Sequence, residues 1–141
     1  MSVPAVIFDD IELWAAGYLK AALDARPEDY TADVFVSNEI PKKADGTPER
    51  RDRMVIIRRD GGPRVEQVFD LPRIGVDCWA TTKQDAVDLA RMVSALLWAA
   101  PGDSNVKTVQ QTAGPIRIPD PSGQPRVYTT FEIKTKGTDL A

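Results

Sequence analysis

The sequence predicts an α+β protein: a two-layer sandwich in which two helices cover one face of a mainly antiparallel β-sheet. Two stretches repeat apolar residues at helical spacing, several short stretches alternate apolar and polar residues, and Gly- or Pro-rich turns separate them. The elements follow the order α-β-β-β-β-α-β-β. With 141 residues, 43% of them hydrophobic, the chain is expected to form one domain over residues 1–141 with a core of its own.

The first helix is expected to begin after Asp9 or Asp10, either of which can cap it, with Glu12 placed as in a capping box. These three carboxylates could also bind a hard cation, but capping explains them better. Pro27 stops the helix soon after Ala25. One buried face is predicted for this helix, made by Ile11, Trp14, Tyr18 and Ala22 and widened by Leu19 and Leu23.

Three strands are predicted at residues 33–37, 54–59 and 73–80. The second holds four consecutive apolar residues, which indicates burial on both faces. A turn at Gly61-Gly62-Pro63 follows it, and residues 65–69 are expected to pair back on it as a hairpin. The third strand alternates: one face carries Ile74, Val76, Cys78 and Ala80, and the other carries Arg73, Gly75, Asp77 and Trp79.

The second helix is the clearest element: it is capped by Thr81 or Thr82 and ends at Pro101-Gly102. Its apolar stripe consists of Ala86, Ala90, Val93, Leu97 and Ala100, with Leu89 and Leu96 beside it. Two further strands are predicted at 106–111 and 127–135. Between them, residues 115–125 contain four prolines, which predicts a stiff extended loop or a hairpin tip.

The composition argues against catalysis. The chain has no histidine, and its single cysteine, Cys78, lies in an apolar alternating run that favours a small core residue over a nucleophile. No nucleophile or phosphate-loop motif is present, so neither an enzyme nor a cofactor or metal site is expected, although a small enzyme stays an alternative. No apolar run approaches the ~20 residues of a membrane span, and no signal peptide is evident, so we expect a soluble protein folded in a reducing cytoplasm.

Charge is distributed unevenly along the chain. Residues 1–40 hold eight acidic and two basic residues, whereas residues 42–59 hold seven basic and three acidic ones. One interpretation is a solvated loop whose charge balances the domain. The other is attraction between copies, because an acidic patch and a basic arm on one chain can make head-to-tail contacts that close into a ring. The candidate assembly or channel contacts are Lys42, Lys43, Arg50, Arg51 and Arg53 of the basic loop 41–53, together with Trp79.

The three tryptophans carry different expectations. Trp14 falls on the buried stripe of the first helix and is expected in the core. Trp98 lies just off the stripe of the second helix, which fits either core or contact surface. Trp79 lies opposite the core positions of its strand, so it becomes an interface residue if that face is not covered within the monomer.

Most of the chain resembles the tail terminator proteins of long-tailed bacteriophages, especially those that infect actinobacteria. The resemblance rests on the N-terminal helix ending in YLKAAL, the extended basic loop, MVIIRRDGGPR, and DLPRIGVDCWATTKQDAVDLARMVSALL. It implies a structural virion protein with an α/β sandwich fold that forms a six-membered ring at the tail–neck junction and is assembled in the host cytoplasm. The proline-rich segment 115–125 matches no pattern of that family.

The resemblance also implies partners. They are other copies of the chain in the ring, the major tail tube protein, a head–tail connector or stopper protein, the tape-measure protein, and genomic DNA in transient non-specific contact. No membrane partner is expected. A stopper or adaptor protein of the phage neck is the alternative within the same class. A nucleic-acid-binding module is disfavoured by the net charge of −3. The basic loop is expected to be a flexible arm that becomes ordered on assembly.

Overall fold

A computed structural model of the protein describes residues 5–64, 67–103 and 105–140. Two helices, α1 (Ile11–Asp24) and α2 (Lys83–Trp98), pack on a mixed sheet, which confirms the α+β prediction. The sheet contains β2 (Phe35–Ser37), β3 (Met54–Arg59), β4 (Phe69–Asp70), β5 (Arg73–Trp79), β6 (Val106–Arg117) and β7 (Arg126–Lys136). A 3-10 turn, η1 (Asp29–Thr31), links α1 to β2.

Both helices begin at a predicted cap residue, Asp10 and Thr82, but the capping box with Glu12 is not formed, because Asp10 rather than Asp9 is the N-cap. The Asp10 carboxylate accepts hydrogen bonds from the backbone N–H groups of Glu12 and Leu13, and the Thr82 hydroxyl accepts one from Asp85. The carboxylates considered as cation ligands are engaged within the chain. Glu12, for example, accepts hydrogen bonds from the side-chain amide of Asn38 and from the backbone N–H of Arg59. In the described part of the chain, no group of three or more Cys, Asp or Glu side chains is placed to hold a metal ion.

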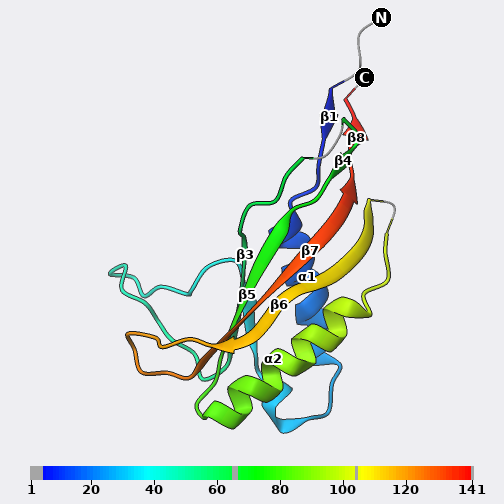
Figure 1. Ribbon diagram of the computed structural model, residues 1–141. Helices are drawn as coiled ribbons and strands as arrows, with labels where there is room; N and C mark the ends of the chain where they lie inside the picture. The colour runs from blue at the N-terminus through cyan, green and yellow to red at the C-terminus, as the bar shows by residue number, and fades with distance from the viewer. Residues whose placement is uncertain (1–4, 65–66, 104, 141) are drawn as a thin grey trace, which may run out of the picture.

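The strand order across the sheet is β2-β3-β5-β7, with β6 on the far side of β7. β4 also pairs with β7, next to the start of β5. All pairs are antiparallel except β2 with β3, so the sheet is mainly antiparallel as predicted. Strands β2 and β6 therefore form its two edges. In Figure 1, the long β6–β7 hairpin and the basic loop extend from the same end of the sheet.

The main core lies between the sheet and both helices. It includes Ile74, Val76 and Cys78 from β5, as the alternation predicted, and Phe131 and Ile133 from β7. Burial, followed by the charge of Asp77, raises the pKa of the Cys78 thiol, as expected for a packing residue. The buried face of α1 differs from the predicted one. Its fully buried residues are Ile11, Ala15, Leu19 and Leu23. Trp14 and Tyr18 are half-buried beside them, with their rings stacked 5.8 Å apart.

Several strand boundaries differ from the predictions. β2 begins at Phe35 rather than residue 33, because Asp33 takes a left-handed φ of 51°. The hairpin predicted for residues 65–69 was wrong: Phe69 pairs with Lys136 of β7, and the neighbour of β3 on that side is β5. Residues 65 and 66 of that prediction lie outside the described residues. A two-stranded ribbon, β1 (Val6–Ile7) with β8 (Thr138–Asp139), was not predicted.

β6 extends six residues further than expected, to Arg117, and so takes in the first part of the proline-rich segment. Three register shifts against β7 interrupt its pairing, which lets an edge strand carry Pro115 without breaking. Residues 118–125 form the turn between β6 and β7, which confirms the hairpin-tip interpretation. No helix in the described ranges has both the length and the apolar composition of a bilayer-crossing segment.

Candidate interaction site

The sheet face opposite the helices, here called the open face, carries a second and smaller apolar cluster. Met54, Ile56 and Trp79 are buried there, with Phe35 and Ile40 packed against them. This explains the four consecutive apolar residues of β3, because two of them face the main core and two face this cluster. Trp79 is only 3% exposed, so its face is covered within the monomer and the condition under which it would be an interface residue is not met.

Two arginines cover Trp79. The guanidinium carbon of Arg126 lies 5.3 Å from the centre of the indole ring, and that of Arg50 lies 5.9 Å from it. Such placement combines burial of the ring with cation–π attraction. Arg50 belongs to the basic loop and Arg126 begins β7, so segments far apart in the sequence close over the same ring.

Alternating charges connect these arginines into what we call the charge chain, which consists of Arg58, Asp77, Arg126, Asp120 and Arg50. The Asp77 carboxylate, 1% exposed, receives Arg126 Nε at 2.7 Å and an Arg58 nitrogen at 3.1 Å. Asp120 lies 3.7 Å from Arg126 and 3.4 Å from Arg50. The two guanidiniums hold this carboxylate in a fixed position, and a buried carboxylate without such a partner would be costly.

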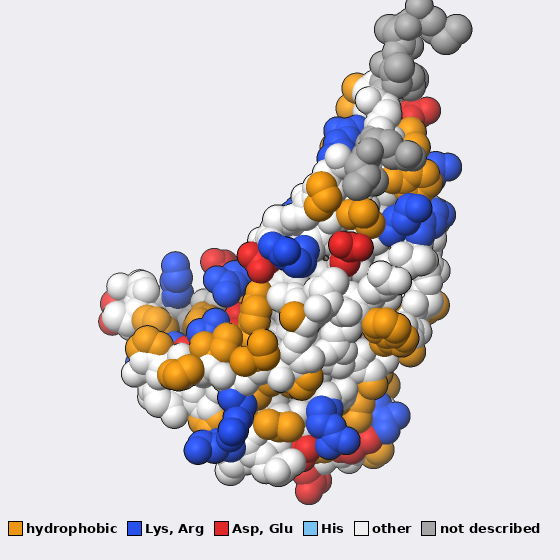
Figure 2. All heavy atoms as spheres, in the orientation of Figure 1, with side chains coloured by type: hydrophobic (Ala, Val, Ile, Leu, Met, Phe, Trp, Pro, Cys, Tyr) orange, Lys and Arg blue, Asp and Glu red, His pale blue; other side chains and the backbone are white. Residues whose placement is uncertain are grey.

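The charge chain joins the basic loop to the hairpin tip 118–125. The side-chain amide of Gln124 strengthens that contact by donating to the backbone carbonyls of Arg51 and Asp52. Figure 1 shows these two loops side by side at one end of the molecule, and Figure 2 shows basic and apolar side chains gathered on that protrusion. The basic loop thus has defined contacts that fasten its base to the hairpin tip, and its flexibility before assembly stays a prediction.

Within the loop, the predicted contact residues separate into two kinds. Arg50 belongs to the charge chain, Arg51 lies over the ring of Phe35, and Arg53 donates to the Ala32 carbonyl at 3.0 Å. In contrast, the ammonium groups of Lys42 and Lys43 make no ion pair or hydrogen bond with other described residues. Of the predicted contact residues of the loop, Lys42 and Lys43 are therefore the two that are fully available to a partner.

Backbone bonds shape the exposed end of the loop. Residue 43 donates to Thr47, Gly46 donates back to residue 43, and Glu49 donates to Pro41. Asp45 accepts from both the hydroxyl and the backbone of Thr47, and these bonds lower the pKa of its carboxyl group. The lysines consequently stand on a small ordered turn that projects from the sheet.

Beneath the loop is a hollow of about 460 Å³ whose floor includes Ile40, Ile56 and Trp79. Lys42, Arg58 and Asp77 stand at its walls. Next to the hollow, the ring of Tyr128 packs directly on Gly75. A Cβ at position 75 would lie 2.4 Å from the Tyr128 hydroxyl oxygen. Burial, and then the hydrogen bond to Asp60, raises the pKa of Tyr128. The hollow offers apolar contact with both signs of charge, which suits a protein surface.

No family model and no curated protein matches this chain.

Sequence reasoning missed Asp77, Asp120 and Arg126 as members of this site. A charged residue in the middle of a strongly apolar strand is a signal that could have identified Asp77, because such a group needs a partner. Asp120 opens the run DPSG, and its carboxylate accepts from Ser122, which is typical of an Asx turn. Nothing local indicates that this turn meets the basic loop some seventy residues earlier.

Asp120 offers a direct test of the contact between the two loops. Burial alone would raise its carboxyl pKa, but hydrogen bonds from Ser122, the charge of Arg50 and the nearby Trp79 lower it on balance. Asp120→Asn is expected to accelerate amide hydrogen exchange in residues 48–53 on the order of tenfold, because it removes the charged partner of Arg50. Hydrogen-exchange mass spectrometry measures this at neutral pH.

The matched control is Asp52→Asn, which makes the same charge change in the loop on a carboxylate without an ion pair among the described side chains. Equal exchange in both variants would contradict the role given to Asp120. The pH dependence has a defined sign. Since folding lowers the pKa, the contribution of Asp120 is present above its unfolded value of about 3.9 and is lost as pH falls through the folded-state value.

Proposed function

We propose that this chain is a structural virion protein, the tail terminator of a long-tailed phage, rather than an enzyme. In this role it forms a ring on the completed tail tube and joins the tube to the capsid neck, with DNA passing through the channel. The segments that carry the sequence resemblance support the proposal, because they form neighbouring parts of the fold: β3, β5 and the helix α2 that follows.

The observation that carries the proposal is the protrusion made by the basic loop and the hairpin tip. Two ordered loops, fastened together by the charge chain, present Lys42 and Lys43 at one end of a stable sheet. An assembly protein needs such a rigid, exposed contact surface, since a preorganised loop loses less entropy on binding. A six-membered ring would repeat this protrusion around one rim.

The test uses tail tubes and tailless, DNA-filled capsids purified from a long-tailed phage that encodes the chain. Gold-labelled protein is expected at the head-proximal end of the tubes in negative-stain images, as rings. Labelling of the capsid portal without labelling of tubes would favour the alternative, a stopper or adaptor of the neck. Binding to neither structure would overturn both assignments.

The two kinds of basic residue in the loop predict separable effects. Lys42→Ala combined with Lys43→Ala is expected to weaken assembly or tail joining by up to about 2 kcal/mol, the sum for two exposed ion pairs, without changing the melting temperature. Arg50→Ala is expected to lower the melting temperature instead, because Arg50 pairs with Asp120 and covers Trp79. Calorimetry and a tail-joining assay measure the two effects.

The salt dependence of binding distinguishes a protein partner from DNA in this experiment. If the two lysines contact the phosphates of duplex DNA, replacing both makes the plot of log affinity against log salt less steep by about 2. If the double lysine variant joins tails at the wild-type rate, the lysines are a solvated surface, and the basic loop has no contact role.

A further inference from the structure

Unpaired charges of opposite sign lie at opposite edges of the sheet. Beside the β2 edge, the carboxylates of Asp33 and Glu39 are exposed and form no ion pair or hydrogen bond with the described residues. Asp29 is equally exposed and unpaired among the described side chains, and it lies in η1, the turn before β2 that contacts α2. At the β6 edge, the cationic groups of Lys83 and Arg117 are exposed and likewise form no ion pair or hydrogen bond with the described residues. Many other surface charges are paired within the chain, as in Lys20 with Asp24 or the charge chain.

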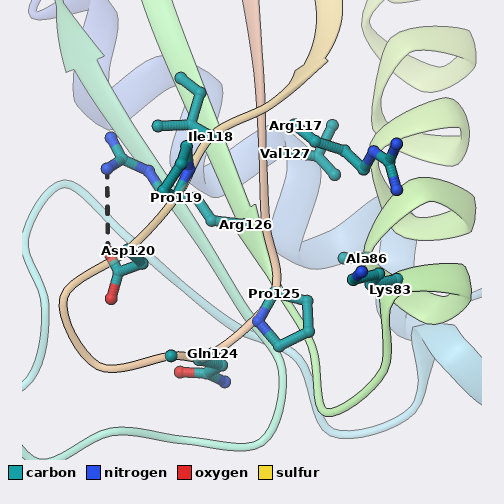
Figure 3. A pocket seen from close by; sticks show the side chains of 11 residues that line it. Lys83, Ala86, Arg117, Ile118, Pro119, Asp120, Gln124, Pro125, Arg126 and Val127 are labelled. Atoms are coloured by element: carbon teal, nitrogen blue, oxygen red, sulfur yellow. Dashed lines mark ion pairs between the residues drawn. The ribbon is translucent and has the colours of Figure 1, made fainter.

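The two basic side chains border a groove of about 500 Å³ between the hairpin tip and the first turn of α2. Figure 3 shows Arg117 reaching toward α2, on which Lys83 lies, while Asp120 is already engaged by Arg126. The floor is apolar and includes Ile118, Pro125 and Val127. A positive rim over an apolar floor fits an acidic segment that also carries apolar side chains.

The backbone at both edges is open to a neighbour over part of its length. Among the described strands, β6 pairs only with β7, and β2 pairs only with β3. Some backbone groups at these edges are nevertheless already bound: Val106 bonds to Asp103 at the start of β6, and the carbonyls of Ala32 and Val34 beside β2 accept from Arg53 and Lys20. Edge strands with free N–H and C=O groups readily add another chain. β6 holds no acidic residue among its twelve, whereas the β2 edge carries exposed carboxylates, and the two cations beside it, Lys20 and Arg53, are already bound to backbone carbonyls.

We propose that the β6 edge and its groove receive the acidic β2 edge, residues 29–39, of a second copy of this chain. The inference rests on the proposed ring function and names the surfaces that would build the ring. A second copy is the occupant because one chain carries both complementary surfaces, at opposite edges of one sheet. Such a contact is heterologous, so its repetition leads to a closed ring or a filament rather than a two-fold dimer.

Reciprocal charge reversal tests the contact. One variant combines Lys83→Glu with Arg117→Glu, which makes the groove acidic. The other combines Asp29→Lys, Glu39→Lys and Asp33→Asn, which makes the β2 edge basic and keeps at position 33 a residue that tolerates the left-handed φ. Each variant alone opposes like charges and is expected to weaken self-association at least about a hundredfold, measured by analytical ultracentrifugation.

An equimolar mixture of the two variants is expected to regain assembly, because each contact again joins opposite charges. All five changes in one chain are expected to restore self-association in the same way. Circular dichroism of each variant shows that loss of assembly is not loss of folding. The control Arg91→Glu changes a charge on the exposed face of α2 away from the groove lining and is expected to leave assembly unchanged.

The remaining outcomes are equally decisive. If the wild type assembles but the mixture does not, the contact lies elsewhere and the inference is overturned, while the ring function stands. If the wild type stays monomeric at low salt and at its highest soluble concentration, the inference is also overturned. The proposed function is then judged separately, by the binding of the chain to tube ends.

Discussion

Asp77→Ala is expected to lower the free energy of unfolding by about 2–4 kcal/mol. The change removes the common partner of Arg58 and Arg126, and the loss of one side of a buried ion pair typically costs about 3–5 kcal/mol. The expectation is set somewhat lower, since the side chain of Arg58 is 58% exposed and water can compensate its charge. Chemical denaturation of the purified protein measures the difference.

A second readout follows from the position of Arg126 above Trp79. Without Asp77, that guanidinium loses its closer partner and keeps only the longer contact with Asp120, so the near-ultraviolet circular dichroism of the tryptophans should change while the far-ultraviolet spectrum persists. The control is Asp24→Ala, which removes a half-exposed pair with Lys20 and should cost less than about 0.5 kcal/mol. Similar losses in both variants would show that the charge chain is no more than a surface ion pair.

The elements predicted best are those specified by neighbours in sequence. Helix caps at Asp10 and Thr82 and the alternation along β5 depend on spacings of two to four residues, which a single sequence displays directly. The placement of Cys78 in the core follows from the same alternation. These features were confirmed because local periodicity and the tertiary fold agree there.

Pairing between distant strands could not be predicted in this way. A period of two indicates a strand but not its neighbour, so residues 65–69 were assigned to the wrong partner, and the short ribbon of β1 with β8 was missed. The length of β6 was missed because Pro115 usually ends a strand, whereas an edge strand with bulges can continue through it.

The burial of Trp79 shows the same limit at the candidate site. The side of β5 opposite the main core was correctly identified, but whether anything covers it depends on the loop that precedes β3 and the turn that precedes β7. In the sequence, Arg50 is one of several cations of the loop. Only its contacts with Asp120 and Trp79 in the structure distinguish it from Lys42. Charge counting located the region and could not assign the individual roles.

The second large effect concerns the glycine pair after β3. Gly61 and Gly62 have φ angles of 91° and 98°, which side-chain-bearing residues rarely adopt. The segment they form is tied to the start of β5: Asp60 donates to the Arg73 carbonyl, Arg73 donates to the Gly61 carbonyl, and Leu71 donates to the Pro63 carbonyl. The two glycines nevertheless differ in the space around them.

A Cβ at position 62 would lie 2.2 Å from the Leu71 carbonyl oxygen and 2.6 Å from the Arg73 nitrogen, whereas at 61 the nearest atom is 3.8 Å away. Gly61→Ala is therefore expected to cost about 1–2 kcal/mol, from backbone conformation alone. Gly62→Ala is expected to cost about 3 kcal/mol or more, because backbone atoms must separate and the bonds to β5 weaken. Denaturation of both variants measures the difference, and equal losses would mean that Gly62 is required for its φ angle rather than for close approach to β5.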